Sequence, residues 1–233
     1  QLTNLGGEVT YGKVISTRNI DNGFEVCTED GETYEGKNLI IASGAAHRHL
    51  GIEREQELIG RGVSYCAVCD GPFFKEKTAA VVGGGSAALQ DALYLAGICS
   101  KVYLIHRRDT FRAEKSLIDQ VMTAENIECV MESHVTALIG EKKLTELEVT
   151  NLSGEKKTLV ADGLFVAIGM EPHNEVFRDL VDLDEAGYVI AGENCKTRTP
   201  GVYAAGDCRT KTVRQLTTAA ADGTVCGLVC KAV

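Results

Sequence analysis

The feature that most constrains the fold is a glycine-rich turn between a short apolar run and a helical pattern. Residues 78–82 are apolar and rich in small and β-branched types, and Gly83-Gly-Gly85-Ser-Ala-Ala88 follows them. The turn fits G-x-G-x-x-G/A, in which the glycines let the backbone approach a pyrophosphate and the small last residue packs helix on strand. The helix N-terminus then offers N–H groups to the phosphates. A glycine-rich turn that binds nothing is the alternative, so the surrounding residues must decide.

The surrounding chain predicts alternating strands and helices. We expect strands at 78–82 and 101–105 and helices at 86–97 and 113–125, which together form a right-handed βαβ unit. Three further apolar runs, at 38–44, 163–169 and 201–207, are typical of strands buried on both faces. Two strand meanders, at 8–34 and 132–160, and a small-residue helix at 215–230 complete the pattern. The sequence therefore predicts an α/β protein.

A basic cluster follows the strand at 101–105. His106, Arg107 and Arg108 stand where an NAD site would place an acidic residue for the ribose 2′-hydroxyl, and Arg112 comes one helical turn further on. Three guanidinium groups suit a 2′-phosphate, so NADPH is favoured over NADH. The alternative is a solvated basic helix start.

Two cysteines at a predicted helix start form the second motif. Cys66 and Cys69 are three residues apart, a spacing that allows a reducible disulfide. A position at a helix N-terminus also lowers the pKa of a thiol. Asp70 can act as proton donor or acceptor if it lies within hydrogen-bond reach. Half of a zinc site and simple core packing are the alternatives. No second cysteine pair exists and the other seven cysteines are scattered, so we expect no metal.

The third motif is a buried strand that ends in Gly206-Asp207, with Arg214, Gln215 and Leu216 at the start of the last helix. A carboxylate at a strand end can accept hydrogen bonds from cofactor hydroxyls. A helix N-terminus can face negative charge on a flavin ring. A simple turn is the alternative.

Composition excludes several classes of protein. Lys and Arg number 24 against 33 Asp and Glu, and the net charge of −9 argues against nucleic acid as a partner. No apolar stretch is long enough to span a bilayer, so we expect no membrane association. Nine cysteines without a disulfide framework fit a reducing compartment, and we expect a cytoplasmic protein.

Taken together and in this order, the motifs resemble those of low-molecular-weight thioredoxin reductases of the bacterial type. The resemblance runs from the strand at 40–44 to the last helix. It implies two Rossmann-like, three-layer dinucleotide-binding domains. The FAD-binding domain would be discontinuous, with residues 1–44 and 170–233, and the NADPH-binding domain with the cysteine pair would be inserted as residues 45–169.

The resemblance also implies roles for individual residues. Cys66 and Cys69 would form the redox-active disulfide with Asp70 as acid/base partner. The NADPH site would comprise Gly83, Gly85, Ser86, Ala87, His106, Arg107, Arg108, Arg112, Ile168 and Gly169. The FAD site would comprise Ser43, Gly44, Gly206, Asp207, Arg214, Gln215 and Leu216.

The implied activity is thioredoxin-disulfide reductase. NADPH reduces FAD, FAD reduces the Cys66–Cys69 disulfide, and the dithiol reduces thioredoxin or a similar small disulfide protein. The cysteine that attacks the partner is left open, and the family is usually a homodimer. The flavoprotein component of an alkyl hydroperoxide reductase and a non-catalytic NADPH-binding fragment are the alternatives.

One family feature is missing from the sequence. The family opens with a βαβ unit whose G-x-G-x-x-G holds the ADP half of FAD, and no such motif precedes Gln1. We therefore expect a member that lacks its N-terminal FAD-binding segment and that binds FAD poorly by itself.

Overall fold

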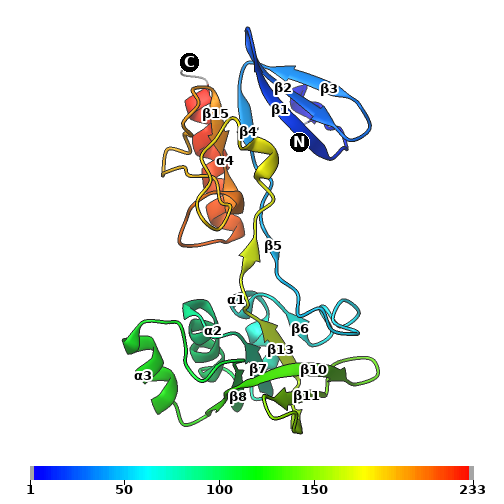
Figure 1. Cartoon of the computed structure of the whole chain (residues 1–233), viewed down its shortest axis with the longest axis vertical. Coiled ribbons are helices and arrows are strands. Elements are labelled where there is room, and N and C mark those ends of the chain that lie inside the picture. The colour runs from blue at the N-terminus through cyan, green and yellow to red at the C-terminus, as the bar shows by residue number, and fades with distance from the viewer. Residues whose placement is uncertain (1–2, 231–233) are drawn as a thin grey trace. The chain divides into compact units, whose positions relative to one another are not determined.

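A computed structural model describes residues 3–230, and it divides the chain into two compact units (Figure 1). Unit 1 comprises Gln1–Ala46 and Met170–Val233, and unit 2 comprises His47–Gly169. Two short strands, β5 (Ala46–His47) and β14 (Met170–Glu171), pair where the chain passes between the units.

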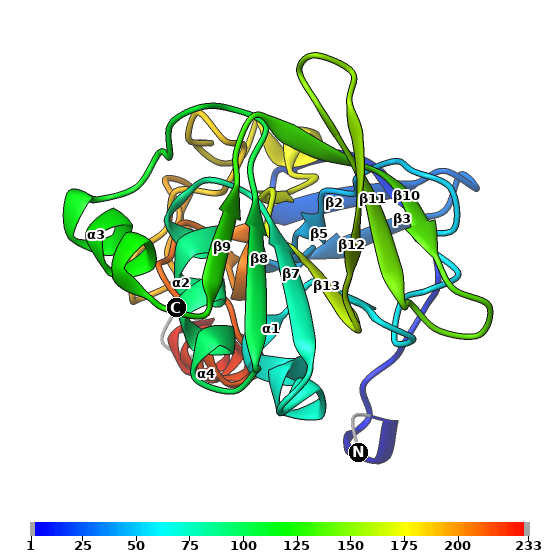
Figure 2. The same cartoon turned by 90° about the horizontal axis from the view of Figure 1, so that it is seen from below.

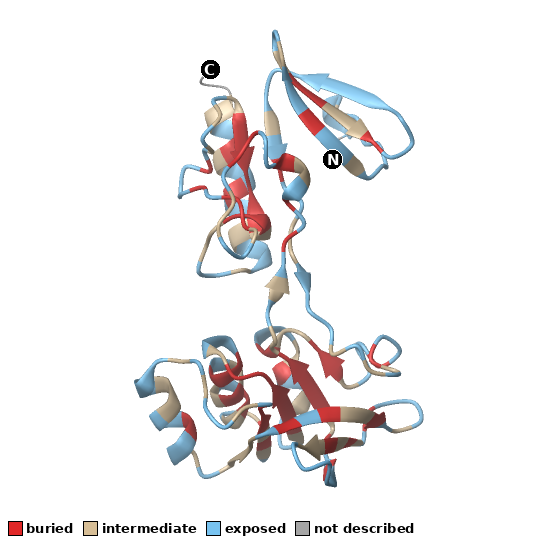
Figure 3. Ribbon diagram, in the orientation of Figure 1, coloured by how far each residue is buried: buried red, intermediate tan, exposed pale blue. Residues whose placement is uncertain are grey.

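Unit 2 is built on a five-stranded parallel sheet. Its strands, in spatial order, are β6 (Val63–Ser64), β13 (Gly163–Val166), β7 (Thr78–Val82), β8 (Lys101–Ile105) and β9 (Ile127–Val130). The central strands are buried on both faces, as Figure 3 shows, which explains their continuous apolar sequences.

Two different layers cover the faces of this sheet. The helices are α1 (Ala67–Asp70), α2 (Ser86–Ala96) and α3 (Lys115–Thr123), and the antiparallel strands are β10 (Ser133–Ile139), β11 (Glu146–Asn151) and β12 (Lys156–Val160). Ala79, Val81 and Leu104 pack with α2 on one face. Ala80 and Ile105 belong to the core cluster that includes side chains of the antiparallel strands, which lie beside the parallel sheet in Figure 2. Alternate residues of each strand thus fill opposite cores.

Unit 1 consists of an antiparallel meander, a pair of short parallel strands and a long helix. Its elements are β1 (Val14–Ile20), β2 (Gly23–Thr28), β3 (Thr33–Gly36), β4 (Leu39–Ile41), β15 (Val202–Ala204), α4 (Leu216–Cys230) and the 3₁₀ helices η1 (Thr3–Leu5), η3 (Glu175–Phe177) and η4 (Gly206–Cys208). The first three strands form an antiparallel meander, and β4 pairs in parallel with β15. Gly23 is required at the first turn, because its φ is +144° and a Cβ there would lie 2.2 Å from the carbonyl oxygen of Gly36.

The structure confirms the predicted α/β class with parallel sheets. It differs from the expectation in details. The first strand begins at Val14 and not near residue 8, and α3 begins at Lys115 and not at residue 113. The sheet of unit 2 also contains β6 and β9, which were not predicted. Among residues 3–230, no helix is long and apolar enough to cross a bilayer.

Candidate functional site

The glycine turn connects β7 to α2 at the carboxyl end of the parallel sheet. A Cβ on Gly83 would lie 2.4 Å from the carbonyl oxygen of Ala167 and 2.6 Å from the Cβ of Ala88. No other residue fits at Gly83, and a larger residue in place of Ala88 would push the helix away from the strand. These two positions therefore hold α2 close against the sheet.

The N-terminus of α2 is open to a ligand. Gly85 is its N-cap, and no side chain caps the helix. A Cβ on Gly85 would meet nothing closer than 3.9 Å, the backbone oxygen of Arg112. The first N–H groups of an 11-residue helix thus lack side-chain partners, as a pyrophosphate site requires. Ser86 and Ala87 occupy this first turn.

The chain after β8 returns to the glycine turn. The backbone N–H of Arg112 donates to the Gly84 oxygen at 2.7 Å, and Gly85 and Arg112 form an isolated parallel bridge. Arg112 therefore lies on an extended segment before α3, which corrects the expectation that it lies one helical turn beyond Arg108. Arg107 and Arg112 are exposed and Arg108 is half-buried. Within residues 3–230 none of the three forms an ion pair, so all three are available to an anion.

His106 precedes these arginines and packs between the glycine turn and Phe111. Its ring stacks on Phe111 at 5.5 Å, its Nε2 lies 3.1 Å from the Thr110 oxygen, and a Cβ on Gly84 would clash with the ring. Burial lowers the pKa of His106, and the neighbouring arginines lower it further. The imidazole is therefore neutral near pH 7.

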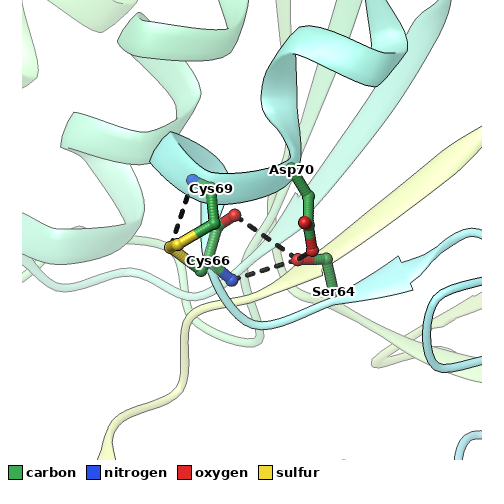
Figure 4. Close-up of a disulfide and its surroundings, with 4 residues drawn as sticks. All are labelled: Ser64, Cys66, Cys69 and Asp70. Atoms are coloured by element: carbon green, nitrogen blue, oxygen red, sulfur yellow. Dashed lines mark hydrogen bonds between the residues drawn. A yellow bond between two sulfur atoms is a disulfide. The ribbon is translucent and has the colours of Figure 1, made fainter. Parts of the chain in front are cut away.

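The cysteine pair lies at the end of β6. Cys66 is the N-cap of α1, and Cys66 and Cys69 form a disulfide with a Cα–Cα distance of 5.3 Å (Figure 4). Cys69 is exposed and Cys66 is half-buried, so a partner disulfide can reach the pair from solvent. The Cys69 N–H lies 3.2 Å from Cys66 Sγ.

Asp70 is held on the other side of this turn. The Ser64 hydroxyl donates to Asp70 Oδ2 at 2.6 Å and accepts from the Cys66 N–H at 3.1 Å. In Figure 4 the Asp70 carboxylate faces Ser64 and the sulfur atoms lie on the opposite side. Sequence reasoning missed Ser64. The available signal was a hydroxyl residue two positions before the pair and six before Asp70.

Unit 1 contains a buried acceptor without a donor. Asp207, in η4 after β15, has its Oδ1 buried with no hydrogen-bond partner among residues 3–230. Such an atom normally has a partner, and the hydroxyls of a sugar or ribityl chain are donors of the right kind. The Arg214 guanidinium stacks on Tyr188 at 4.0 Å, and its Nε lies 3.4 Å from the Asp207 backbone oxygen. The residues present thus fit a hydroxyl-bearing cofactor.

The remaining predicted positions flank these features. In unit 1 the Ser43 hydroxyl donates to Asn174 Oδ1 at 2.8 Å, and Gly44 adopts a φ of +69°. Gln215 and Leu216 lie at the start of α4, and Leu216 is 86% exposed. The Gly206 N–H donates to Asp222 Oδ2 at 2.9 Å.

In unit 2, Ile168 packs on the core cluster of the antiparallel strands. The Gly169 oxygen accepts the Arg48 N–H at 3.0 Å. Both positions follow β13, at the same end of the sheet as the glycine turn. No group of three metal-ligating side chains occurs in the described part of the chain.

A glycine turn for a dinucleotide and a surface disulfide in one α/β unit define a class of redox enzyme. The family model described as pyridine nucleotide-disulphide oxidoreductase matches residues 3–223, and the chain belongs to this family. The expectation of an NADPH-dependent flavin disulfide oxidoreductase is confirmed at the level of this enzyme class.

Within this class the chain is similar to thioredoxin reductases. It is 41% identical to that of Listeria innocua over 226 residues, which cover 96% of this chain and 70% of the relative. It is 38% identical to that of Treponema pallidum, covering 96% of this chain and 72% of the relative. The crystal structure of the Streptococcus pyogenes thioredoxin reductase matches with a TM-score of 0.92 and 37% identity, over 99% of this chain and 76% of that one. The resemblance to bacterial thioredoxin reductases is confirmed.

Proposed function

We propose that this protein is a thioredoxin-disulfide reductase in which the Cys66–Cys69 disulfide accepts electrons from NADPH by way of FAD and passes them to thioredoxin. The observation that supports it most is the accessible disulfide in the same unit as an uncapped dinucleotide turn. Relatives with the printed name thioredoxin reductase support the choice of partner, and one of them, from Mycobacterium leprae, is named as a bifunctional thioredoxin reductase/thioredoxin.

The NADPH site would lie at the N-terminus of α2. The N–H groups of Gly85, Ser86 and Ala87 would bind the pyrophosphate. Arg107, Arg108 and Arg112 would bind the 2′-phosphate, since none is neutralised by a carboxylate within the described residues. The neutral His106 ring would pack against Gly84 and so hold the segment that carries the three arginines next to the glycine turn.

The FAD site would lie in unit 1. Asp207 would accept hydrogen bonds from ribityl hydroxyls through its unpartnered Oδ1, with Ser43, Gly44 and Gly206 beside the cofactor. Arg214, Gln215 and Leu216 would bring the start of α4 to the flavin ring. When bound, the flavin supplies two-electron transfer between a nicotinamide and a disulfide.

The cysteine pair would perform the exchange with the partner. In the dithiol form one cysteine thiolate attacks a partner sulfur, a mixed disulfide forms, and one partner thiolate leaves. The second cysteine loses its proton and attacks the mixed disulfide, which closes the Cys66–Cys69 bond and releases the second partner thiol. Asp70 would accept and return the proton of this second step through intervening water, because its carboxylate faces Ser64 and not the sulfur atoms.

The setting of the reaction is also part of the proposal. Seven cysteines are free thiols, four of them buried, which is compatible with a reducing compartment. We infer that the protein works in the cytosol, as its cysteine content suggests, and that the full-length form acts as a homodimer, as the family resemblance implies.

The test is a pair of single substitutions, Cys66→Ser and Cys69→Ser, in protein saturated with FAD. Each should abolish thioredoxin reduction and leave NADPH-driven bleaching of the flavin absorption band intact, because the substitutions touch neither dinucleotide site. Cys129→Ser, a half-buried free thiol of the same unit, is the matched control and should retain full activity. Thioredoxin reduction that survived in both pair variants would make the disulfide structural and refute the proposal.

A further inference from the structure

Opening the sulfur–sulfur bond removes the covalent link between the two ends of the turn that carries the disulfide. Helix α1 has only four residues, and a helix of that length is unstable by itself. Its backbone hydrogen bonds run from the Asp70 N–H to the Cys66 oxygen at 3.1 Å and from the Gly71 N–H to the Ala67 oxygen. In the dithiol form the disulfide no longer fixes Cys66 against Cys69. Some other contact must keep the two sulfur atoms ready to close again.

Ser64 supplies a contact that does not depend on the disulfide. Its hydroxyl joins the two ends of the turn, because it donates to Asp70 Oδ2 at 2.6 Å and accepts from the Cys66 N–H at 3.1 Å (Figure 4). The Cys66 oxygen lies at 3.4 Å from the same hydroxyl. A hydroxyl has one hydrogen to donate, and the nearer, charged carboxylate is the stronger acceptor.

The anchor itself is rigid. Ser64 is 5% exposed and lies on β6, where it pairs with Phe165 of the buried strand β13. Its hydroxyl therefore connects the short surface turn to a strand of the parallel sheet.

We propose that Ser64 is the positioning residue of the redox-active turn: its hydroxyl keeps Asp70 and Cys66 in register while the Cys66–Cys69 bond is open. This rests on the proposed function, which assigns the proton of the exchange reaction to Asp70. A serine that only satisfied the Cys66 N–H would contribute to folding alone. The second hydrogen bond, to the carboxylate, is what predicts an effect on the reaction.

The affected step is closure of the pair. One cysteine thiolate attacks oxidised glutathione, which forms a mixed disulfide and expels one glutathione thiolate. The other cysteine then gives its proton to Asp70 through intervening water, attacks the mixed disulfide and expels the second glutathione thiolate, which takes up that proton. One disulfide is reduced and one is formed. Only this second step needs the turn to be in register.

The experiment uses the full chain, reduced and then mixed with oxidised glutathione. The mixed disulfide and the closed pair are followed by acid quenching and mass spectrometry of the peptide that contains Cys66 and Cys69. Ser64→Ala should slow closure about fivefold to tenfold, as expected for loss of one hydrogen bond, and should change the first step less than about twofold. Ser64→Thr keeps the hydroxyl and should restore closure.

A matched control separates positioning from stability. Ser133 is also buried in unit 2, where its hydroxyl donates to the Met131 oxygen at 2.8 Å at the start of β10. Ser133→Ala removes a comparable hydrogen bond away from the turn and should leave closure unchanged. Equal closure rates in Ser64→Ala and Ser133→Ala would overturn the proposal.

A double-mutant cycle with Asp70→Ala tests the route of the effect. If Ser64 acts through Asp70, Ser64→Ala should slow closure less than about twofold in the Asp70→Ala background. Additive effects would overturn the proposal. If Asp70→Ala by itself leaves closure unchanged, the assigned role of Asp70 fails as well. An effect of Asp70→Ala with a silent Ser64→Ala overturns only the inference about Ser64.

Discussion

The two units of the chain fill their interiors by different means. In unit 2 the five-stranded parallel sheet is packed on both faces by apolar clusters, one of which includes Leu164 and the other Phe165. Unit 1 has apolar clusters of its own around Ile41 and Tyr203. Its interior also contains the charged residues Arg209, Lys211 and Asp222. The comparison teaches that apolar patterning accounts for most of the interior of unit 2, whereas unit 1 also depends on buried charged groups that must pair with each other.

The charged residues of unit 1 form one cluster around Asp222. Its Oδ1 accepts from the Arg209 guanidinium at 2.7 Å, and its Oδ2 accepts from Lys211 at 2.8 Å and from the Gly206 N–H at 2.9 Å. The hydrogen bond from Arg209 holds the pKa of Asp222 well below its usual range. Asp222 therefore ties α4 to the turn that presents Asp207.

The largest expected effect is that of Asp222→Ala on unit 1. It leaves two buried cations without a partner and should destabilise the unit by about 3–5 kcal/mol. Hydrogen exchange, read separately for peptides of the two units, is the measurement. Asp182→Ala, which removes an exposed partner of Arg198, is the control and should cost less than about 1 kcal/mol. Equal destabilisation of unit 2 would contradict the claim that this charged cluster stabilises unit 1 specifically.

The same cluster predicts a pH dependence. Because the folded pKa of Asp222 is depressed, its stabilisation is fully present above its unfolded pKa of about 3.9 and is lost only as the pH falls further. The stability of unit 1 should therefore change little in mild acid. Asp222→Asn should remove the loss of stability that the native protein shows below about pH 3.9.

The second prediction sharpens the role of unit 2. Replacing Arg107 and Arg108 by Ala should weaken NADPH binding by about 2–3 kcal/mol, roughly 30-fold to 150-fold, because charge-assisted bonds to a phosphate are lost. NADH binding should change little, since NADH lacks that phosphate. Titration of both nucleotides measures the difference, and Arg178→Ala in unit 1 is the control. Equal losses for the two nucleotides would refute the 2′-phosphate assignment.

The third and smallest effect concerns a charge inside unit 2. Burial on α2 raises the pKa of Asp91 to about 6. With a folded pKa above the unfolded value, the carboxyl destabilises the fold as the pH rises from about 4 through about 6. Asp91→Asn should therefore stabilise unit 2 by about 1–2 kcal/mol near pH 8 and by little at acid pH. Urea unfolding at the two pH values tests this, with the exposed Asp119→Asn as control. A difference in unfolding free energy between Asp91→Asn and the native chain that was the same at both pH values would contradict the burial of the charge.

The sequence predicted those parts of the fold whose signal is local. The strands at 78–82 and 101–105 have the predicted bounds, because each is a polar residue followed by four mostly apolar ones and ends before a glycine or a basic residue. Strand β6 was missed because two residues carry no periodicity, and Ser64 was missed with it. Its importance comes from a contact with Asp70 that only the folded turn creates.

The site followed the same division. The cysteine pair and the glycine turn are short motifs and were found in the sequence. The return of Arg112 to Gly84 depends on an extended segment that replaced the expected helical turn. The cluster of Arg209, Lys211 and Asp222 was not predicted, because its partners lie 11–13 residues apart and meet only when α4 packs against η4.

The most direct test of the account is an anaerobic titration of the FAD-saturated protein with NADPH, followed by alkylation and mass spectrometry of every cysteine. The account predicts that NADPH produces alkylated thiols at Cys66 and Cys69, and that full reduction consumes one NADPH for the disulfide and one for each flavin. The other seven cysteines should be alkylated equally with and without NADPH. Flavin reduction by NADPH with the Cys66–Cys69 disulfide intact would contradict it.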